Sequence, residues 1–285
     1  MALSCLLHYL YRPQRRQAPK PYEGHDMKDP KPELIPTGNS DLSVPRAACG
    51  EQKVVCGLCS LSRLCLPLGL RSPDMEKLDA SIVRHRPLDR GRHLFQRGDP
   101  FTAIYAVRSG CVKTYVLTKA GKEHIRAFHL PGDIIGLDAI DAGHYPSSAR
   151  VLQASGLCEL PFDRLDLALA QAPSLQNRLL DIMSRALRHE ASMALLVKAP
   201  AAERLAAFLC SLSQRYAERG YSAREFILGM PRHAIGNYLG LTEETVCRMF
   251  TRLQKSGLLS TRGKQVHIHK PGELHDLAGL PWPVC

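Results

Sequence analysis

Three cysteines in residues 56–65 constrain the fold more than any other feature of the sequence. Cys56, Cys59 and Cys65 follow a C-x2-C-x5-C spacing. The two residues between the first pair allow both sulfur atoms to turn toward one point, as thiolate ligands of a metal must. Gly57 frees the backbone for that turn. Three thiolates do not complete a tetrahedral site, so the fold must bring a fourth ligand from elsewhere in the chain.

Several kinds of site could use this cysteine segment. Free cysteines are often small buried apolar residues, but the segment has little apolar periodicity. Structural zinc usually takes a second C-x2-C or H-x-H pair, and none follows. An iron–sulfur cluster accepts uneven spacing and one remote cysteine, so it is the favoured interpretation. The spacing does not choose the fourth ligand among Cys49, Cys111 and Cys158.

Length and composition favour a two-domain protein with a polyanionic partner. The 285 residues suffice for two domains, and the net charge of +11 suggests binding to nucleic acid. Ten cysteines are too sparse for a disulfide scaffold of this size. A reducing cytoplasm fits them better. No stretch is long enough to span a membrane, so we expect no membrane partner.

The order of patterns along the chain predicts an α+β protein. Residues 1–48 are proline-rich and are expected to form a disordered arm. Residues 49–170 combine the cysteine segment, a short helix over 71–86 and a domain rich in predicted strands. From Pro87 to Phe162, short alternating runs are broken by regularly spaced turns, which predicts an antiparallel β-roll or barrel.

A long dimerisation helix is expected within residues 171–199. Apolar residues recur there at steps of four and three, the pattern of a coiled-coil seam. Alternatively, this stripe covers the roll. Glu190 is the exception in the seam: two copies would repel each other across a parallel dimer, unless the side chain turns to solvent or pairs with Arg185 or Arg188. The expected interface consists of Leu179, Met183, Ala186, Leu187, Glu190, Met193 and Val197.

Residues 200–285 match a winged helix-turn-helix. A helix over 203–219 is followed by a short helix from Pro231 to Leu239 and a second one capped by Thr242. This second helix ends at Gly257, and a basic hairpin over 258–268 forms the wing. Helix, tight turn, helix and basic hairpin together predict DNA binding.

The second helix of this motif has one apolar and one polar face. Glu accepts from cytosine N4 and Arg donates to guanine O6 and N7, so Glu244 and Arg248 are expected to read one G·C pair. The alternative is a solvent-exposed i,i+4 ion pair. Arg262 in the wing is placed for phosphate contact. The full DNA-binding set is Glu244, Cys247, Arg248, Thr251, Lys255, Arg262 and Lys264.

With these residues assembled, the chain resembles the CRP/FNR family of bacterial transcription regulators, and within it the FNR branch of anaerobic oxygen sensors. The resemblance covers Cys56 to Leu277. It is carried by Cys56-Gly57-Leu58-Cys59 with Leu64-Cys65, Pro131-Gly132-Asp133-Ile134-Ile135-Gly136, Leu157-Cys158-Glu159-Leu160-Pro161-Phe162, Ala202-Glu203-Arg204-Leu205-Ala206-Ala207-Phe208 and Leu239-Gly240-Leu241-Thr242-Glu243-Glu244-Thr245-Val246-Cys247-Arg248.

The resemblance implies a cyclic-nucleotide-binding-like jelly roll and a [4Fe–4S] cluster held by Cys56, Cys59, Cys65 and Cys158. It implies that oxygen converts the cluster, that the homodimer then loosens and that DNA is released. The implied target is an inverted repeat of TTGAT-type half-sites in genes of anaerobic metabolism. Residues 118–124 match the surface that contacts the sigma factor of RNA polymerase.

One departure and two rival functions accompany the resemblance. The family has serine where this chain has Cys247, which predicts a looser preference at the contacted thymine.

A regulator that senses another small ligand would share the roll. A bound nucleotide phosphate would lack the arginine that it needs as a partner, because Arg150 is displaced. A zinc or thiol redox sensor is the other alternative. We expect no enzyme, because His189-Glu190-Ala191-Ser192-Met193 lacks the second His of a metalloprotease and no nucleophile–base pair stands out.

Overall fold

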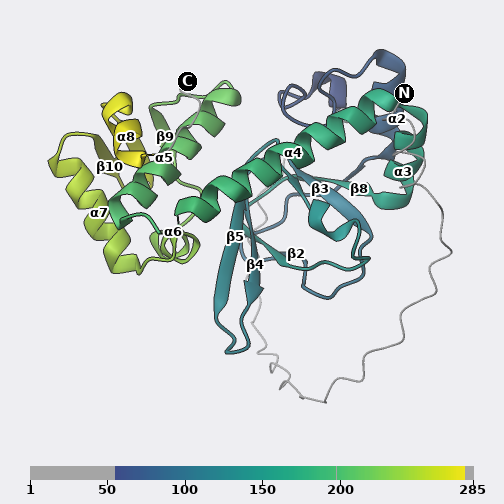
Figure 1. Cartoon of the computed structure of the whole chain (residues 1–285). Helices are drawn as coiled ribbons and strands as arrows, with labels where there is room; N and C mark the ends of the chain where they lie inside the picture. Colours follow the sequence, from purple (N-terminus) through teal and green to yellow (C-terminus); the bar gives the residue numbers. More distant parts are fainter. Residues whose placement is uncertain (1–54, 197, 280–285) are drawn as a thin grey trace, which may run out of the picture. The chain divides into compact units, whose positions relative to one another are not determined.

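The computed structural model describes residues 55–196 and 198–279 (Figure 1). The expected arm over 1–48, Cys49, Val197 and Cys285 therefore lie outside the described residues. The described chain runs through a β-roll and a long helix into a small, mainly helical domain. No helix within the described ranges has the length and apolar character needed to cross a membrane.

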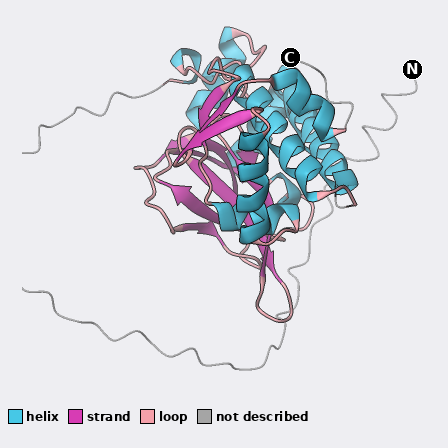
Figure 2. Cartoon of the chain, turned by 90° about the vertical axis from the view of Figure 1, so that its left-hand side faces the viewer, coloured by secondary structure: helices cyan, strands magenta, loops and turns pink. Residues whose placement is uncertain are grey.

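Two four-stranded antiparallel sheets form the roll (magenta in Figure 2). One sheet has the order β1-β8-β3-β6 and the other the order β2-β7-β4-β5. This arrangement confirms the antiparallel roll predicted from the spacing of turns. The strands are β1 (Val83–Arg84), β2 (His93–Phe95), β3 (Ala103–Val107), β4 (Cys111–Leu117), β5 (Glu123–His129), β6 (Ile134–Ile135), β7 (Ser148–Gln153) and β8 (Leu157–Pro161).

Apolar and aromatic side chains fill the interior of the roll. Phe95, Val107, Val151 and Tyr145 belong to one buried cluster. The rings of Tyr145 and Phe95 stack with centroids 3.7 Å apart. The Tyr145 hydroxyl donates to the carbonyl oxygen of Ala103 over 2.7 Å, so its one polar group is satisfied inside the core.

One strand connection requires glycine. Gly110 lies in the turn between β3 and β4 with φ of 86°. A Cβ atom at this position would lie 2.3 Å from Ser155 Oγ and 2.5 Å from the carbonyl oxygen of Ala154. Any other residue would be strained in its backbone and would collide with the neighbouring loop.

The first helix is shorter than predicted. Helix α2 spans Ser72–Ser81, preceded by the 3-10 turn η1 (Cys56–Leu58). The expectation of a helix to residue 86 was wrong, because Val83 pairs with Glu159 as part of β1. The β-branched residues Ile82 and Val83 suit an extended backbone, and the open edge of β8 offers the hydrogen bonds for it.

Two helices follow the roll. Helix α3 (Phe162–Gln171) was not predicted, whereas α4 (Pro173–Leu196) is the expected long helix. The first turns of α4 bury Leu175 in a core cluster that also contains Leu66 and Leu78. From there α4 runs toward α5 (Ala201–Glu218) and α6 (Arg232–Leu239) (Figure 1). One helix thus extends from the cysteine segment to the C-terminal domain.

The C-terminal domain is a winged helix-turn-helix, as predicted. Its small sheet has the order β10-β11-β9. Gly240 ends the first helix of the motif in the left-handed region (φ 65°) and makes the tight turn. Strand β9 and helix α8 were not predicted. The elements are α5 (Ala201–Glu218), β9 (Glu225–Ile227), α6 (Arg232–Leu239), α7 (Glu243–Lys255), β10 (Leu259–Arg262), β11 (Gln265–Ile268) and α8 (Pro271–Ala278).

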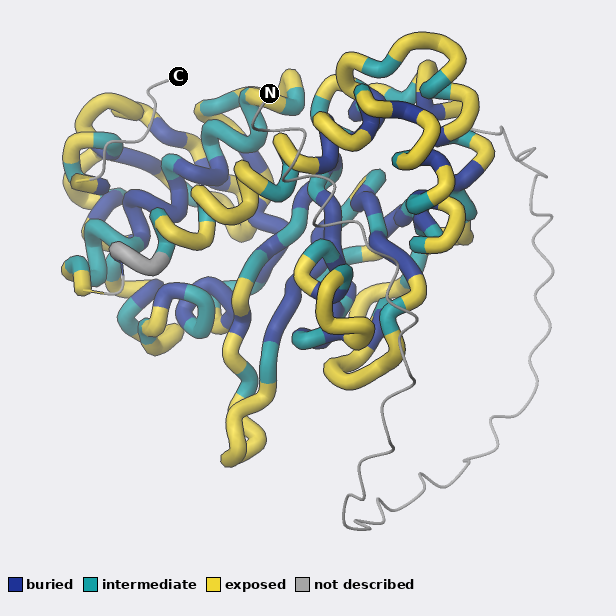
Figure 3. Tube along the Cα trace, turned by 45° about the vertical axis from the view of Figure 1, so that its right-hand side comes forward, coloured by how far each residue is buried: buried dark blue, intermediate teal, exposed yellow. Residues whose placement is uncertain are grey.

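The β4–β5 hairpin shares a core with the C-terminal domain. Ile125 and Phe128 belong to the same buried cluster as Phe208 and Ile235. The Asn237 carboxamide accepts from the Ile125 N–H over 2.7 Å and donates to the Glu123 carbonyl over 2.7 Å. The tip of the hairpin extends beyond this contact and is exposed (Figure 3).

Candidate functional site

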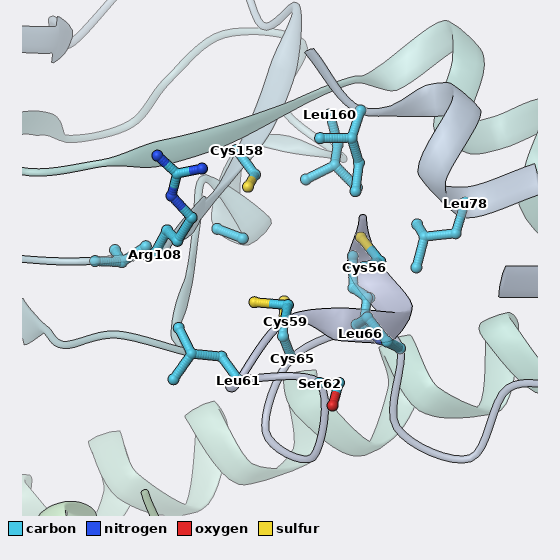
Figure 4. Close-up of a pocket in the computed structure, with 14 residues that line it drawn as sticks. Cys56, Cys59, Leu61, Ser62, Cys65, Leu66, Leu78, Arg108, Cys158 and Leu160 are labelled. Atoms are coloured by element: carbon cyan, nitrogen blue, oxygen red, sulfur yellow. The ribbon is translucent and has the colours of Figure 1, made fainter. Parts of the chain in front are cut away.

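Four cysteines line one pocket between the cysteine segment and β8 (Figure 4). Cys56, Cys59 and Cys65 come from the segment, and Cys158 comes from the strand. The remaining lining is mostly apolar, with Arg108 at one side. The fold therefore brings the three clustered thiols beside one remote thiol.

Cys111 is not part of this pocket. It is fully buried in the core that β4 shares with the C-terminal domain. A Cβ atom added at Gly229 would lie 3.1 Å from the Cys111 sulfur, so the thiol is packed against backbone. Among the described cysteines that spacing left open as a fourth ligand, Cys158 is the one that faces the other three.

Tight turns and helix α2 hold the cysteine segment in place. The Cys59 N–H donates to the Cys56 carbonyl over 3.2 Å, and the Cys65 N–H donates to the Leu61 carbonyl over 3.0 Å. Asp79 in α2 accepts a hydrogen bond from the Cys56 N–H over 2.8 Å. Arg84 pairs with Asp79 and also lies 3.6 Å from the Cys56 sulfur.

The thiols of Cys56, Cys65 and Cys158 favour their protonated form. Burial raises the pKa of Cys56 to about 12, and the carboxylate of Asp79 adds to the increase. Burial likewise raises the pKa of Cys65 to about 12, with contributions from Cys158 and Cys59. The pKa of Cys158 is also raised by burial. Thiolates would need a positive charge, such as bound iron or zinc, to form here at neutral pH.

The pocket does not have the geometry of a site for one metal ion. Within residues 55–196 and 198–279, no group of three or more His, Cys, Asp or Glu side chains could hold a single ion. Four cysteine thiols are a donor set that both a [4Fe–4S] cluster and a structural zinc ion use.

Helix α7 has the two faces that its sequence predicts. Val246, Phe250 and Leu253 are buried against the domain core. Thr242 caps the helix, since its side chain accepts from the Thr245 N–H over 3.1 Å. The opposite face is exposed and consists of Glu244, Cys247, Arg248, Thr251 and Lys255.

The polar residues of this face and of the wing are free to contact a partner. The ion pairs found among the described residues do not include one between Glu244 and Arg248. Arg262 and Lys264 flank the exposed turn between β10 and β11.

Arg232, at the start of α6, is a basic residue of the helix-turn-helix that the sequence analysis did not single out. Its guanidinium lies over the Phe250 ring, 3.3 Å from the centroid. Its Nη1 atom is buried and has no hydrogen-bond partner among the described residues. The face of the Phe250 ring offsets part of the cost of burying this unsatisfied group. The available signal was an arginine directly after Pro231, where the first helix of the motif begins.

The expected interface residues of α4 divide into two groups. Leu179 is only 8% exposed and lies in the core of its own chain, and Met183 packs against the same core. Ala186 and Glu190 are exposed, as is Leu187 at 67%. Met193 packs against the C-terminal core. The exposed part of the predicted seam therefore lies in the second half of the helix.

Glu190 has a partner that the sequence did not suggest. It is paired with Arg126 in β5, with Nη2 and Oε1 3.4 Å apart. The same guanidinium lies 3.7 Å from Asp138. The alternative pairing with Arg185 or Arg188 does not occur in the structure.

Comparisons with known proteins place both parts of the chain. Residues 85–172 match the model of the cyclic nucleotide-binding domain, and residues 203–277 match the Crp-like helix-turn-helix domain. A solved structure of FixK2 from Bradyrhizobium japonicum aligns with a TM-score of 0.62 and 30% identity, covering 68% of this chain and 97% of that one. The fold and the exposed face of α7 define a DNA-binding transcription regulator.

Relatives of known identity agree with this class. The chain is 48% identical to the transcriptional activator protein anr of Pseudomonas aeruginosa, covering 83% of this chain and 95% of the relative. It is 44% identical to the fumarate and nitrate reduction regulatory protein of Escherichia coli K12, again over 83% and 95%. The chain belongs to the CRP/FNR family of transcription regulators, and it is not an enzyme.

Proposed function

We propose that this protein is an oxygen-responsive, cytoplasmic transcription regulator with a [4Fe–4S] cluster held by Cys56, Cys59, Cys65 and Cys158. The observation that carries the proposal is the pocket that gathers these four thiols. The Escherichia coli relative is named for fumarate and nitrate reduction. We extend to this chain the control of genes for anaerobic metabolism.

The chemistry of the pocket supports a cluster. When bound, such a cluster supplies iron that reacts with oxygen. Asp79 fixes the backbone of Cys56, and Arg84 and Arg108 place positive charge beside the thiolates. The apolar lining from Leu61, Leu66, Leu78 and Leu160 restricts access of water. These residues hold the ligands in place and limit how fast the pocket opens to solvent.

Dimerisation through α4 is the step that we propose to depend on the pocket. The exposed Leu187 and its neighbours Ala186 and Glu190 offer a surface for a second copy of the helix. Two copies of α7 would then enter successive major grooves of an inverted repeat. A monomer would contact one half-site only and bind far more weakly.

Readout of DNA is assigned to the exposed face of α7. Glu244 and Arg248 would read one G·C pair of a TTGAT-type half-site, and Cys247 would contact the thymine methyl group. Thr251, Lys255 and the wing residues Arg262 and Lys264 would contact the backbone.

The β4–β5 hairpin is the surface that we propose for RNA polymerase. Residues 118–124 lie at its tip, which projects from the roll and is mostly exposed (Figure 3). The base of the hairpin is fixed to α6 through Asn237. The sigma factor would therefore bind to a hairpin tip whose position relative to α6 is fixed by the hydrogen bonds of Asn237.

A regulator that senses a different small ligand is the second candidate. The roll has the cyclic nucleotide-binding fold, but Tyr145 and Phe95 stack inside it where a ligand would need space. Arg150 lies in β7 opposite His93 and Lys113. The crowded interior favours the cysteine pocket as the sensor site.

Anaerobic reconstitution with iron and sulfide tests the proposal. We expect about four iron atoms and four sulfides per chain, with the broad visible absorption of an iron–sulfur cluster. Binding of one zinc ion and no iron under the same conditions would instead support a zinc or thiol redox sensor.

A further inference from the structure

A buried arginine of α4 binds the cysteine segment directly. The Arg178 Nε atom donates to the Cys65 carbonyl over 3.0 Å, and Nη2 donates to the Leu64 carbonyl over 2.6 Å. Arg178 is only 4% exposed. Its two acceptors lie in the segment that supplies three of the pocket's thiols, more than a hundred residues earlier in the chain.

The buried guanidinium of Arg178 depends on these two carbonyl oxygens for its hydrogen bonds. The ion pairs among the described residues do not include Arg178. A buried guanidinium that loses its acceptors pays a large desolvation penalty. If the cysteine segment moved away, Arg178 would lose both of its hydrogen-bond acceptors. Helix α4 would then have to move with the segment to keep the buried guanidinium hydrogen-bonded.

Packing reinforces this link on both sides of Arg178. Leu66, next to Cys65, lies in the same buried cluster as Leu175 and Leu179 of α4. Met183, one turn farther along, packs against that cluster from its rim. A shift of the cysteine segment would thus act on α4 within one turn of the surface assigned to the dimer.

We propose that Arg178 is the residue that couples the state of the cysteine segment to α4. It is a positioning residue: it contacts backbone carbonyls and does not reach the thiols. The inference rests on the proposed function, since it assumes that iron binds in the pocket and that α4 forms the dimer. With iron bound, the segment is fixed, Arg178 keeps both acceptors and α4 stays in its dimerising position.

The test compares the dimer dissociation constant of the full chain with and without anaerobic loading of iron and sulfide. In Arg178→Gln, iron content should match that of the unaltered protein, because all four cysteines remain. The iron-dependent change in the dissociation constant should fall at least about tenfold, since two charged hydrogen bonds are lost in each copy. Arg178→Lys keeps the positive charge but loses the planar pair of N–H donors. It should reduce the iron-dependent change in the dissociation constant by a smaller factor. The exposed Arg164→Gln in α3, outside the surface assigned to the dimer, is the matched control and should change nothing.

The outcomes separate the possible failures. If the unaltered protein shows iron-dependent dimerisation and Arg178→Gln shows the same ratio, the inference is overturned while the proposed function stands. Equal weakening of the loaded and iron-free dimers would also overturn it, because that result describes a merely structural residue. Loss of iron from Arg178→Gln would place Arg178 in the cluster site and overturn the coupling role. If the unaltered protein itself shows no iron-dependent change, the proposed function fails together with the inference.

Discussion

Arg126 in β5 and Glu190 in α4 form an ion pair across 3.4 Å within one chain. In a parallel dimer of α4, two Glu190 side chains would approach each other and repel. Arg126 supplies each of them with a counter-charge, so the repulsion is reduced and not abolished. We therefore propose that the pair influences how readily two chains associate.

Replacement of Glu190 by Ala should increase dimerisation in air. The loss of the repulsion should strengthen the iron-free dimer by about 1–2 kcal/mol, less than for an unpaired buried carboxylate. Sedimentation of the iron-free variant at micromolar concentration measures this directly. A monomer indistinguishable from the unaltered protein would contradict the role of Glu190.

Replacement of Arg126 by Ala should have the opposite sign. Without its counter-charge, Glu190 repels its counterpart more strongly, and the iron-loaded dimer should dissociate more easily by about 1 kcal/mol. The double variant Arg126→Ala with Glu190→Ala should dimerise like Glu190→Ala alone. Additive effects of the two substitutions would show that the ion pair has no part in the association.

Serine substitutions should identify the four ligands of the pocket. Cys158→Ser, like the same change at Cys56, Cys59 or Cys65, should abolish iron binding and visible absorption after anaerobic reconstitution. Cys111→Ser and Cys210→Ser are the controls and should retain both, because these thiols lie outside the pocket. Full iron content in Cys158→Ser would exclude Cys158 as the fourth ligand.

Arg248 and Lys264 should affect DNA binding in different ways. Arg248→Ala should weaken binding to the cognate site by about 1–3 kcal/mol and remove discrimination at one base pair. Lys264→Ala should weaken binding to all sequences alike and reduce its salt dependence. Fluorescence anisotropy with cognate and single-substituted duplexes distinguishes them. Equal losses on every duplex for Arg248→Ala would make Arg248 a phosphate contact.

Two partly buried histidines should make the fold sensitive to mild acid. Burial lowers the pKa of His129 to about 4 and that of His189 to about 4. Unfolded histidine titrates near 6.5, so the unfolded chain takes up protons first as the pH falls. The free energy of unfolding should therefore be level above pH 7 and fall by about 1–2 kcal/mol per histidine by pH 5.

Urea denaturation at several pH values measures this loss. His129→Gln should reduce the slope between pH 7 and 5, whereas the exposed His233→Gln should leave it unchanged. A slope that persists in full in both His129→Gln and His189→Gln would assign the pH dependence to other groups.

Local patterns predicted the elements but not the contacts between them. Turn spacing predicted the roll, and the cap at Thr242 with the glycine at 240 predicted the helix-turn-helix, because both depend on neighbours in sequence. Helix α2 ended early because Val83 pairs with Glu159, a partner far away in the chain. The spacing of apolar residues along a helix does not indicate that a distant strand will pair with its last residues.

The same limit applies to the candidate sites. The C-x2-C-x5-C spacing indicated a ligand set, but it could not place Cys158 beside the other thiols without the fold. Arg126 and Arg178 carried no sequence signal, since their roles come from Glu190 and from the carbonyl of Cys65 across the tertiary structure. Residues that act through long-range contacts are visible only once the chain is folded.

The most direct test of the account is DNA binding by one anaerobic preparation before and after exposure to air. The iron-loaded protein should be coloured, dimeric and bound to a duplex carrying an inverted TTGAT-type repeat. Admission of air should bleach the visible absorption and release the DNA in parallel as the protein becomes monomeric. DNA binding that persists unchanged after complete bleaching would contradict the claim that the cysteine pocket controls this regulator.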